Sequence, residues 1–400
     1  MNPTALVNDA PSSAQRLLAA AAEVPSPMLL LDLDVVQDRY LALRAALPQA
    51  RVLYAVKANP HPRILQRLAD LACGFDIASP GELAECRSLS GAAPLLSYGN
   101  PMKKAADIAL AHRAGVDLFA VDSRMELDKI ARAARGARIF CRLAVSGAGA
   151  EWPLTHKFGC TQDEAADLLE SAKSMGLRPS GLSFHVGSQQ TEPAAWRHAI
   201  HRAGEVFRAA RRRGLALNFL NLGGGLPAHY DHPVPPLAAY AEEIRAAVAQ
   251  TFGDARPELL IEPGRYLAGD AGLLVTEVVL VADRPHERVR RWVYLDAGVW
   301  SGLDESMGER IRYRVHVEGA ADRPSGPVVL AGPTCDSADV IYRHGVELPL
   351  DLQAGERVWF LSAGAYTACC STVAFNGFPP LETRCIDSDG RIERELGDLV

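Results

Sequence analysis

Apolar and polar positions follow a regular repeat along residues 50 to 265. Short apolar, β-branched runs end in polar residues or glycine, and an Ala-, Leu- and Arg-rich stretch with helical spacing follows most of them, as in PRILQRLADLA (62–72). The eight runs are RVLYAVK (51–57), GFDIAS (74–79), PLLSY (94–98), DLFAVD (117–122), ARIFCRLAV (137–145), SGLSFHV (180–186), LNFLNLG (217–223) and ELLIEP (258–263). Alternating strand and helix patterns predict a parallel sheet. Eight such units in roughly 250 residues have the size of a closed (β/α)8 TIM barrel, an α/β fold.

The pattern changes after Gly272. Strand-like runs, from GLLVTEVVLVAD to TRCIDSDGR, are separated by Gly, Pro and Asp turns and show little helical period. This pattern predicts a second, mostly β C-terminal domain, to which the run PMLLLDLDVV (27–36) can add a strand. The expected boundaries are 37–270 for the barrel, and 1–36 with 271–400 for the β domain.

Composition and charge narrow the classes of function. Of 400 residues, 48% are hydrophobic and 22% charged, as in ordinary globular proteins. Lys plus Arg total 42 and Asp plus Glu total 48, so the formal net charge is 42 − 48 = −6, which argues against a nucleic-acid partner. There is no stretch of about 18 apolar residues, so we expect no membrane span. The polar start MNPTALVNDAPSS is unlike a secretory signal, and we therefore expect a cytoplasmic protein.

The chain has eight cysteines, and none of them forms a C-x-x-C pair. This spacing argues against a zinc ribbon or a thioredoxin-like site. We interpret seven of them as small buried hydrophobic residues. Cys335 differs, because it lies between Thr334 and Asp336 in a Gly-Pro turn.

Chemically useful residues occupy the ends of the predicted barrel strands, where the active site of such a barrel forms. In strand order they are Lys57, Asp76, Arg142, His185 with Ser188, Gly223 with Gly224 and Gly225, and Glu262 with Gly264 and Arg265. Taken singly, Lys57 is more typical of an ordinary strand-end lysine, the glycine motifs are typical of turns, and His185 could be a core histidine. Their coincidence on one rim favours a site.

The residue types on this rim suit one cofactor. A lysine amine can form a Schiff base with an aldehyde. Consecutive glycines let backbone N–H groups approach an anion, and Arg265 can add charge-assisted bonds. A carboxylate such as Glu262 can keep a ring nitrogen protonated, and the imidazole of His185 can stack on a flat ring. Together they predict a site for pyridoxal 5′-phosphate (PLP).

Seven motifs then resemble the ornithine/diaminopimelate/arginine decarboxylase family, which are fold-type III, alanine-racemase-like PLP enzymes. They are YAVKANP (54–60), FDIASPGEL (75–83), FHVGSQ (184–189), LGGGLP (222–227), EPGR (262–265), GPTCDSADVI (332–341), and GAYT (364–367) with FNGF (375–378). They cover nearly the whole chain in the expected order, and the bacterial ornithine or lysine/ornithine branch is the most similar.

The resemblance implies roles for the barrel residues. Lys57 would bind PLP covalently, Glu262 would pair with the pyridine nitrogen, and His185 would stack on the ring. Asp76 and Arg142 would support Lys57 and the ring from nearby. The phosphate would be bound by Gly223, Gly224, Gly225, Gly264, Arg265, Ser188 and Tyr366.

The resemblance also implies a head-to-tail homodimer with shared active sites. Cys335 and Asp336 would come from the partner subunit, with Cys335 protonating the carbanion that remains after CO₂ leaves and Asp336 holding the distal ammonium of the substrate. Tyr366 and Phe375 would also contact the substrate. Lys157 and Asp339 match a charge pair that crosses the dimer in the family.

The motif around Cys335 bears on the substrate. Diaminopimelate decarboxylases of this family usually have Cys-Glu here, whereas Cys335-Asp336 and the segment EWPLTHKFG (151–159) resemble the ornithine branch. We place L-ornithine first, giving putrescine, and L-lysine second, giving cadaverine, since one methylene in a pocket is worth about 1–3 kcal/mol. Diaminopimelate and a conjugated diamino acid of a specialised pathway stay open. So does the choice of a further substrate-binding acid after Asp296, for which the candidates are Asp304, Glu305 and Glu309.

Three other classes of protein compete with this interpretation. A non-catalytic or regulatory PLP-binding homologue is disfavoured by the presence of both Lys57 and Cys335. A metal-dependent barrel hydrolase could use His229, Asp231 and His232, but the first strand ends in lysine rather than in metal ligands, so no metal is expected. A racemase on the same fold is disfavoured by the Cys335-Asp336 motif.

Overall fold

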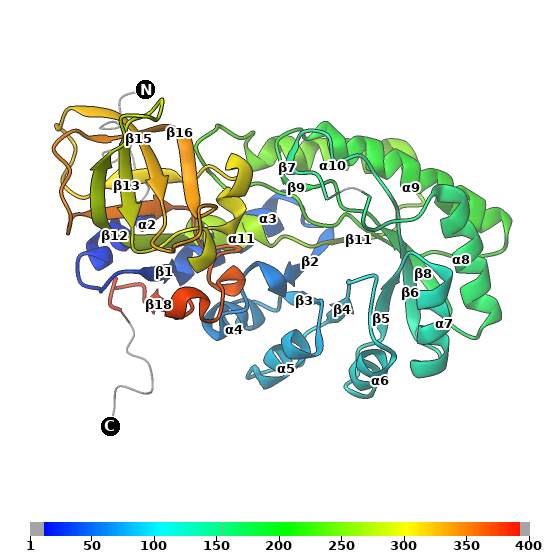
Figure 1. Cartoon of the computed structure of the whole chain (residues 1–400). Helices are drawn as coiled ribbons and strands as arrows, with labels where there is room; N and C mark the ends of the chain where they lie inside the picture. The colour runs from blue at the N-terminus through cyan, green and yellow to red at the C-terminus, as the bar shows by residue number, and fades with distance from the viewer. Residues whose placement is uncertain (1–11, 155, 393–400) are drawn as a thin grey trace. The chain divides into compact units, whose positions relative to one another are not determined.

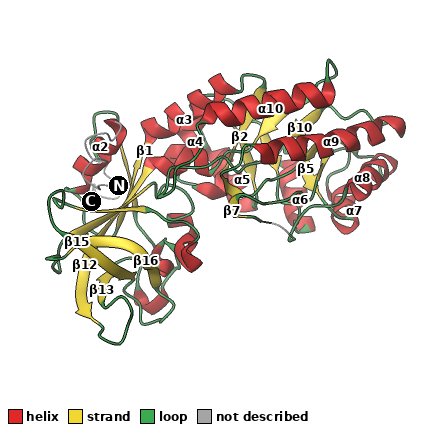
Figure 2. Cartoon of the chain, turned by 90° about the horizontal axis from the view of Figure 1, so that it is seen from above, coloured by secondary structure: helices red, strands yellow, loops and turns green. Residues whose placement is uncertain are grey.

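The computed structural model describes residues 12–154 and 156–392, and these form two compact units. One unit comprises residues 39–227 and 234–266, and the other comprises residues up to 38, 228–233 and 267 onward. The start MNPTALVNDA and Thr155 of the segment EWPLTHKFG lie outside the described residues. Figures 1 and 2 show the helices and strands of the two units.

The first unit is a closed barrel of eight parallel strands, as predicted. Its strands pair in the order β10-β11-β2-β3-β4-β5-β6-β8, so that β11 beside β2 closes the barrel. The strands are β2 (Ala50–Ala55), β3 (Gly74–Ile77), β4 (Leu96–Tyr98), β5 (Leu118–Val121), β6 (Arg138–Arg142), β8 (Arg178–Ser183), β10 (Phe219–Asn221) and β11 (Glu258–Ile261). All eight predicted runs are therefore confirmed as barrel strands in their predicted order.

Helices connect the barrel strands and form an outer layer around them (Figure 2). Local signals set their starts: Pro62 and Pro80 occupy the first helical positions of α4 and α5, and Thr161 forms a capping box with Glu164 at α8. The helices are α3 (Leu33–Ala46), α4 (Pro62–Asp70), α5 (Pro80–Ser88), α6 (Ala105–Arg113), α7 (Arg124–Ala133), α8 (Gln162–Ser174), α9 (Ala194–Arg212), α10 (Leu237–Phe252) and α11 (Arg265–Ala268).

Large side chains fill the barrel interior. Phe140 and Phe219 meet edge to face with ring centroids 5.7 Å apart, and Leu53, Leu118 and Leu260 pack in the same cluster. A filled interior leaves the strand ends as the place where a ligand can bind. A two-stranded sheet that the sequence did not predict, β7 (Ala150–Trp152) with β9 (Ser188–Gln190), lies in the loops after β6 and β8.

The second unit is mostly β, as predicted. Its sheet runs β14-β17-β12-β13-β15-β16, with β1 pairing β12 and β18. The strands are β1 (Met28–Asp32), β12 (Gly272–Asp283), β13 (Arg291–Leu295), β14 (Arg314–Val317), β15 (Ser325–Ala331), β16 (Val340–Pro349), β17 (Arg357–Leu361) and β18 (Thr383–Ile386). Helix α2 (Ser12–Ala21) covers β1 and β12, burying Leu17 against Met28 and Leu273.

Residues 228–233 pack with this unit because their polar groups are bound there. The ring of His229 contacts Asp270 at 2.7 Å, and the N–H of Asp231 donates to the carbonyl of Arg312 at 2.9 Å. Short 3-10 turns complete the described chain: η1 (Val56–Ala58), η2 (Gly269–Ala271), η3 (Val299–Ser301), η4 (Asp304–Glu309), η5 (Ala368–Cys370) and η6 (Phe375–Gly377).

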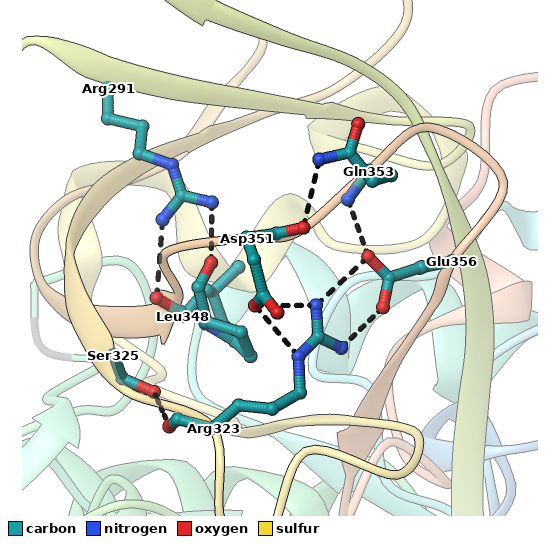
Figure 3. Close-up of polar contacts among 8 residues, drawn as sticks. Arg291, Arg323, Ser325, Leu348, Asp351, Gln353 and Glu356 are labelled. Carbon is teal, nitrogen blue, oxygen red and sulfur yellow. Dashed lines mark hydrogen bonds and ion pairs between the residues drawn. The ribbon is translucent and has the colours of Figure 1, made fainter.

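Two arginines fix the turns of the β unit (Figure 3). Arg323 donates to Asp351 at 2.8 Å and to both carboxylate oxygens of Glu356, while Arg291 donates to the carbonyl of Leu348 at 3.3 Å. The bonds of Arg323 tie the chain before β15 to the turn that connects β16 with β17, and the bond of Arg291 links the start of β13 to the end of β16.

Candidate active site

Lys57 and Asp76 form an ion pair at the end of the barrel where the strands end. Lys57 lies in η1, the turn just after β2, and its Nζ is 3.4 Å from Oδ2 of Asp76 on β3. The lysine side chain is 46% exposed and that of Asp76 only 3%. An accessible amine is thus paired with a buried carboxylate. Gly99 leaves room for this carboxylate, because a Cβ there would lie 2.1 Å from Oδ1 of Asp76.

Glu262 follows β11 directly, and a neighbouring amide holds it in place. Asn221, fully buried at the end of β10, donates from Nδ2 to Oε1 of Glu262 at 2.5 Å. Burial and the nearby charge of Asp76 raise the pKa of Glu262 to about 7. A cationic group brought beside this carboxylate would stabilise its ionised form, which is the condition for pairing with a protonated ring nitrogen.

The three glycines after β10 have no space for side chains. Gly223 has φ +64°, and a Cβ there would lie 2.0 Å from the carbonyl oxygen of Phe184. A Cβ on Gly224 would lie 2.7 Å from the carbonyl oxygen of Glu262, and one on Gly225, at φ +119°, would lie 2.5 Å from that of Gly187. The segment is a turn that only glycine can form, and the lack of side chains is what lets backbone N–H groups approach a ligand closely.

Arg265 is positioned beside these glycines. It is buried, and its Nε and Nη2 both donate to Oγ of Ser188 at 3.1 Å. The loops after β8 and β10 are also bonded together, because the N–H of Gln190 donates to the carbonyl of Gly225 at 2.9 Å. A buried guanidinium, a hydroxyl and glycine backbone thus converge in one region, which suits a phosphate.

His185 lies in the same rim as a neutral ring. Its Nδ1 accepts from the N–H of Gly187 at 3.1 Å, and burial followed by the charges of Arg142 and Lys57 lowers its pKa well below the ordinary value. Because a cationic imidazole is disfavoured there, the ring can present a flat, uncharged face to an aromatic ligand.

Arg142, at the end of β6, stacks on Phe158 with its Cζ 5.5 Å from the ring centroid. Beside it a cavity of about 820 Å³ is lined by residues 144–148 and 156–159 together with Pro153, Asp122 and Arg202. Most of the described part of the segment EWPLTHKFG therefore lines this cavity, and Lys157 is one of the lining residues.

The remaining predicted residues, Cys335, Asp336, Tyr366 and Phe375, lie in the β unit. Cys335 is exposed, and both its N–H (3.2 Å) and its Sγ (3.4 Å) contact Oδ1 of Asn376. Oδ1 of Asp336 accepts from the N–H of Ala338 at 2.9 Å, and Phe375 packs edge to face on Trp300 at 5.8 Å.

Two acids of the β unit, Glu309 and Asp339, already accept hydrogen bonds from groups of the same unit. Glu309, one candidate for a further substrate-binding acid, accepts from Arg312 at 2.7 Å and from the N–H of Arg343 at 2.8 Å, so its carboxylate already serves a turn. Asp339 is buried and accepts from the N–H of Val299 and from the N–H and hydroxyl of Thr334, at 2.7–3.0 Å. These bonds account for the burial of Asp339 without a partner charge.

Sequence reasoning missed three positioning residues, Asn221, Gly99 and Asn376. Each acts on a predicted residue through a contact that depends on the fold: Asn221 on Glu262, Gly99 on Asp76, and Asn376 on Cys335. Asn221 lies in the predicted strand run LNFLNLG, directly before the motif LGGGLP, and Asn376 lies within the motif FNGF. This proximity is the signal that could have identified them.

The barrel residues fit PLP by their chemistry. The cofactor presents an aldehyde, a basic ring nitrogen and a phosphate, and the rim presents a lysine amine, a carboxylate and a glycine turn with a buried arginine. By contrast, within residues 12–154 and 156–392 no three His, Cys, Asp or Glu side chains gather into a potential metal site.

Comparisons with known proteins identify the family. The family model described as "Pyridoxal-dependent decarboxylase, pyridoxal binding domain" matches residues 33–269. The lysine/ornithine decarboxylase of Selenomonas ruminantium is 36% identical over 367 residues, covering 92% of this chain and 91% of that protein. Antizyme inhibitor 2 of Xenopus laevis is 32% identical over 359 residues, covering 87% of this chain and 78% of that protein.

A solved structure agrees. The lysine/ornithine decarboxylase of Vibrio vulnificus in complex with cadaverine has a TM-score of 0.83 at 33% identity, covering 94% of this chain and 98% of that one. No helix in the described part of the chain is both long enough and apolar enough to cross a bilayer. The matched family model and these relatives show that the chain belongs to the PLP-dependent ornithine/arginine decarboxylase family, which includes the lysine/ornithine decarboxylases of bacteria.

Proposed function

We propose that this chain removes CO₂ from a basic L-amino acid, with L-ornithine as the first substrate and L-lysine as the second. The observation that carries the proposal is the exposed Lys57 amine, 3.4 Å from buried Asp76, on the same rim as Glu262 and the glycine turn. This set of groups supports PLP chemistry at the α-carbon of an amino acid.

Each rim residue then has one task. Lys57 binds the aldehyde, Glu262 keeps the ring nitrogen protonated, and His185 covers one face of the ring as a neutral imidazole. Asp76 pairs with the Lys57 amine, and Arg142 supports Lys57 and the ring from nearby. The phosphate is bound by Gly223, Gly224, Gly225, Gly264, Arg265, Ser188 and Tyr366. The bound cofactor supplies the electron sink that stabilises the electrons left at the α-carbon when CO₂ departs.

The proton that replaces CO₂ comes from Cys335 in this proposal, and Asp336 pairs with the distal ammonium of the substrate. Both residues act on the barrel of a partner subunit in a head-to-tail homodimer. The exposure of Cys335 and the hold of Asn376 on its thiol support a role at such a shared site. Asp336 supplies the negative charge that a diamino acid requires.

The choice of ornithine and lysine rests on Asp336 and on the relatives. The Vibrio vulnificus relative was solved with cadaverine and also with putrescine, the diamines that correspond to lysine and ornithine. Because the two substrates differ by one methylene, discrimination of about 1–3 kcal/mol is expected and activity on both is compatible with the proposal.

The test measures CO₂ release from L-ornithine, L-lysine, meso-diaminopimelate and L-arginine with the PLP-loaded protein. We expect release from ornithine above lysine, a visible absorbance band that Lys57→Ala abolishes, and a specific loss of kcat in Cys335→Ala. Release only from diaminopimelate would contradict the role of Asp336. A PLP band without any CO₂ release would favour the alternative of a non-catalytic, PLP-binding homologue, and a protein without a band would contradict the cofactor site.

A further inference from the structure

Two adjacent cysteines lie side by side in the β unit. Cys369 and Cys370 belong to the η5 turn, and their sulfur atoms are 3.9 Å apart. Cys369 is exposed and Cys370 is half-buried, and neither forms a disulfide. Five other cysteines are buried, so their interpretation as packing residues is confirmed, whereas that interpretation is wrong for Cys369 because its side chain faces solvent. The buried cysteines are Cys73, Cys86, Cys141, Cys160 and Cys385.

The two thiols differ in reactivity. Their mutual hydrogen bond lowers the pKa of Cys369, against partial desolvation of its sulfur and the nearby charges of Asp304 and Glu305. The same bond raises the pKa of Cys370. The thiolate is the nucleophilic form of cysteine, so the exposed Cys369 is the attacking sulfur. The Cys370 thiol is close enough to react with the Cys369 sulfur once that sulfur has been oxidised.

We propose that Cys369 and Cys370 form a modification site that reacts with hydroperoxides and closes to a disulfide between adjacent residues. The Cys369 sulfur attacks the peroxide oxygen, the O–O bond breaks, and the peroxide leaves as water or an alcohol while Cys369 becomes a sulfenic acid. The Cys370 sulfur then attacks that sulfur, forming the S–S bond and releasing water. Both thiols are oxidised by two electrons in total, one hydroperoxide is reduced, and both thiol protons leave in the products.

The geometry of neighbouring residues makes this bond easy to reduce again. Consecutive Cα atoms are about 3.8 Å apart across a trans peptide, whereas disulfides usually join Cα atoms about 4.4–6.8 Å apart. The turn must therefore deform when the S–S bond closes. Strained and exposed disulfides have the more oxidising potentials, so ordinary thiols can reopen this one.

The deformation would reach the substrate side of the proposed active site. Tyr366 precedes the turn, and Phe375 and Asn376 follow it, with Asn376 bonded to the thiol of Cys335. Between them the N–H and the hydroxyl of Thr372 donate to the carbonyl of Trp300 at 2.9 and 2.8 Å, which limits how the segment can absorb the change. Oxidation therefore lowers decarboxylation reversibly, and this consequence, unlike the modification itself, rests on the proposed function.

Mass spectrometry tests the modification without any assay of activity. Trypsin releases residues 358–384 as one peptide whose two cysteines are Cys369 and Cys370. After the PLP-loaded protein is treated with stoichiometric hydrogen peroxide, we expect this peptide to lose two hydrogen atoms and to regain them with dithiothreitol. Cys369→Ser and Cys370→Ser should each abolish that loss, and each untreated variant should keep its decarboxylase activity.

Three results would overturn the site: a peptide that stays reduced, one that proceeds to sulfinic acid without a disulfide, or one cross-linked to the peptide that carries Cys335. Activity is read separately in the same samples. A reversible severalfold loss in the wild type, absent from both serine variants, supports the effect on the turn. A disulfide that forms in a protein that releases no CO₂ even when reduced would keep the modification and reject the proposed function.

Discussion

The side chain of Asn221 is bonded at both ends within the rim: Nδ2 donates to Oε1 of Glu262 at 2.5 Å, and Oδ1 accepts from the N–H of Gly223 at 2.9 Å. One buried amide therefore holds both the carboxylate that we propose to pair with the ring nitrogen and the turn that we propose to bind the phosphate. This arrangement makes the geometry of the acid depend on the glycine turn.

Replacing Asn221 with Asp should move the acid limb of the activity profile. The variant keeps an acceptor for Gly223 but replaces the donor to Glu262 with a negative charge, which raises the pKa of Glu262 further. Because the ionised form of Glu262 is the one required, we expect the acid limb of kcat/KM to shift to higher pH and PLP to bind more weakly. An unchanged acid limb together with unchanged PLP affinity would show that Asn221 has only a packing role.

Glu262 should also make the stability of the PLP-free protein depend on pH. Its pKa is about 7 in the folded protein against an ordinary value of 4.5, so the folded state binds more protons between these values. The contribution of Glu262 to the free energy of unfolding is fully present below about pH 4.5. It falls by at most about 3 kcal/mol as the pH rises through about 7. Glu262→Gln should flatten this part of the profile of unfolding free energy, measured with urea. An equally steep profile in that variant would assign the effect to other groups.

Gly224→Ala should weaken cofactor binding much more than it weakens folding. The new Cβ would lie 2.7 Å from the carbonyl oxygen of Glu262 and 3.1 Å from Nε2 of His185, which displaces the turn or the ring. We expect at least about a tenfold rise in the Kd for PLP, equivalent to about 1.4 kcal/mol. Gly81→Ala is the matched control, because its Cβ meets only Oγ of Ser79 at 3.6 Å. Equal PLP affinity in the two variants would contradict the proposal that the glycine turn binds the phosphate.

Glu126→Gln should destabilise the barrel strongly. Glu126 and Lys103 are both almost fully buried and lie 3.1 Å apart, and burial lowers the pKa of Lys103 to about 8. Removal of the carboxylate leaves the buried Lys103 ammonium with the carbonyls of Asn100 and Ala120 but without this counter-ion, which costs about 3–5 kcal/mol in urea unfolding. Asp128→Asn on the same helix is the control, since its pair with Arg124 is exposed and is worth about 0–1 kcal/mol. Similar losses in both variants would contradict this prediction.

Asp339→Ala and Lys157→Ala separate two roles of Asp339. The structure gives Asp339 three hydrogen bonds within its own unit, so its loss should cost about 2–4 kcal/mol of unfolding free energy and displace the loop of Cys335. If the charge pair across subunits were its main role, Lys157→Ala would weaken dimerisation to the same extent. We expect Lys157→Ala to leave the unfolding free energy of the β unit unchanged.

The barrel could be predicted from the sequence because its strands are buried apolar runs at regular spacing. Lys57, His185, Gly223 and Glu262 stand at or near the ends of such runs, and Asp76 lies within one. The structure brings them to one rim.

Contacts between side chains of different strands could not be predicted. The bond from Asn221 to Glu262 requires the register that places Asn221 opposite Leu260, and the space for Asp76 depends on a glycine one strand further along. The sheet of β7 and β9 was missed because its strands have three residues each and are largely polar. The thiol pair escaped notice because adjacent cysteines show no spacing motif, and their orientation is set by the η5 turn.

Closure of the barrel has a consequence for the order of events during synthesis. Lys57 follows β2, the glycine turn follows β10 and Glu262 follows β11, and these three strands are consecutive neighbours around the barrel although the first is made long before the other two. A nascent chain that ends before β11 carries the lysine but lacks both the last strand and the carboxylate. Capture of the cofactor therefore reports that the last strand has paired with the first, and a lysine exposed on the growing chain has no preformed pocket in which to retain an aldehyde.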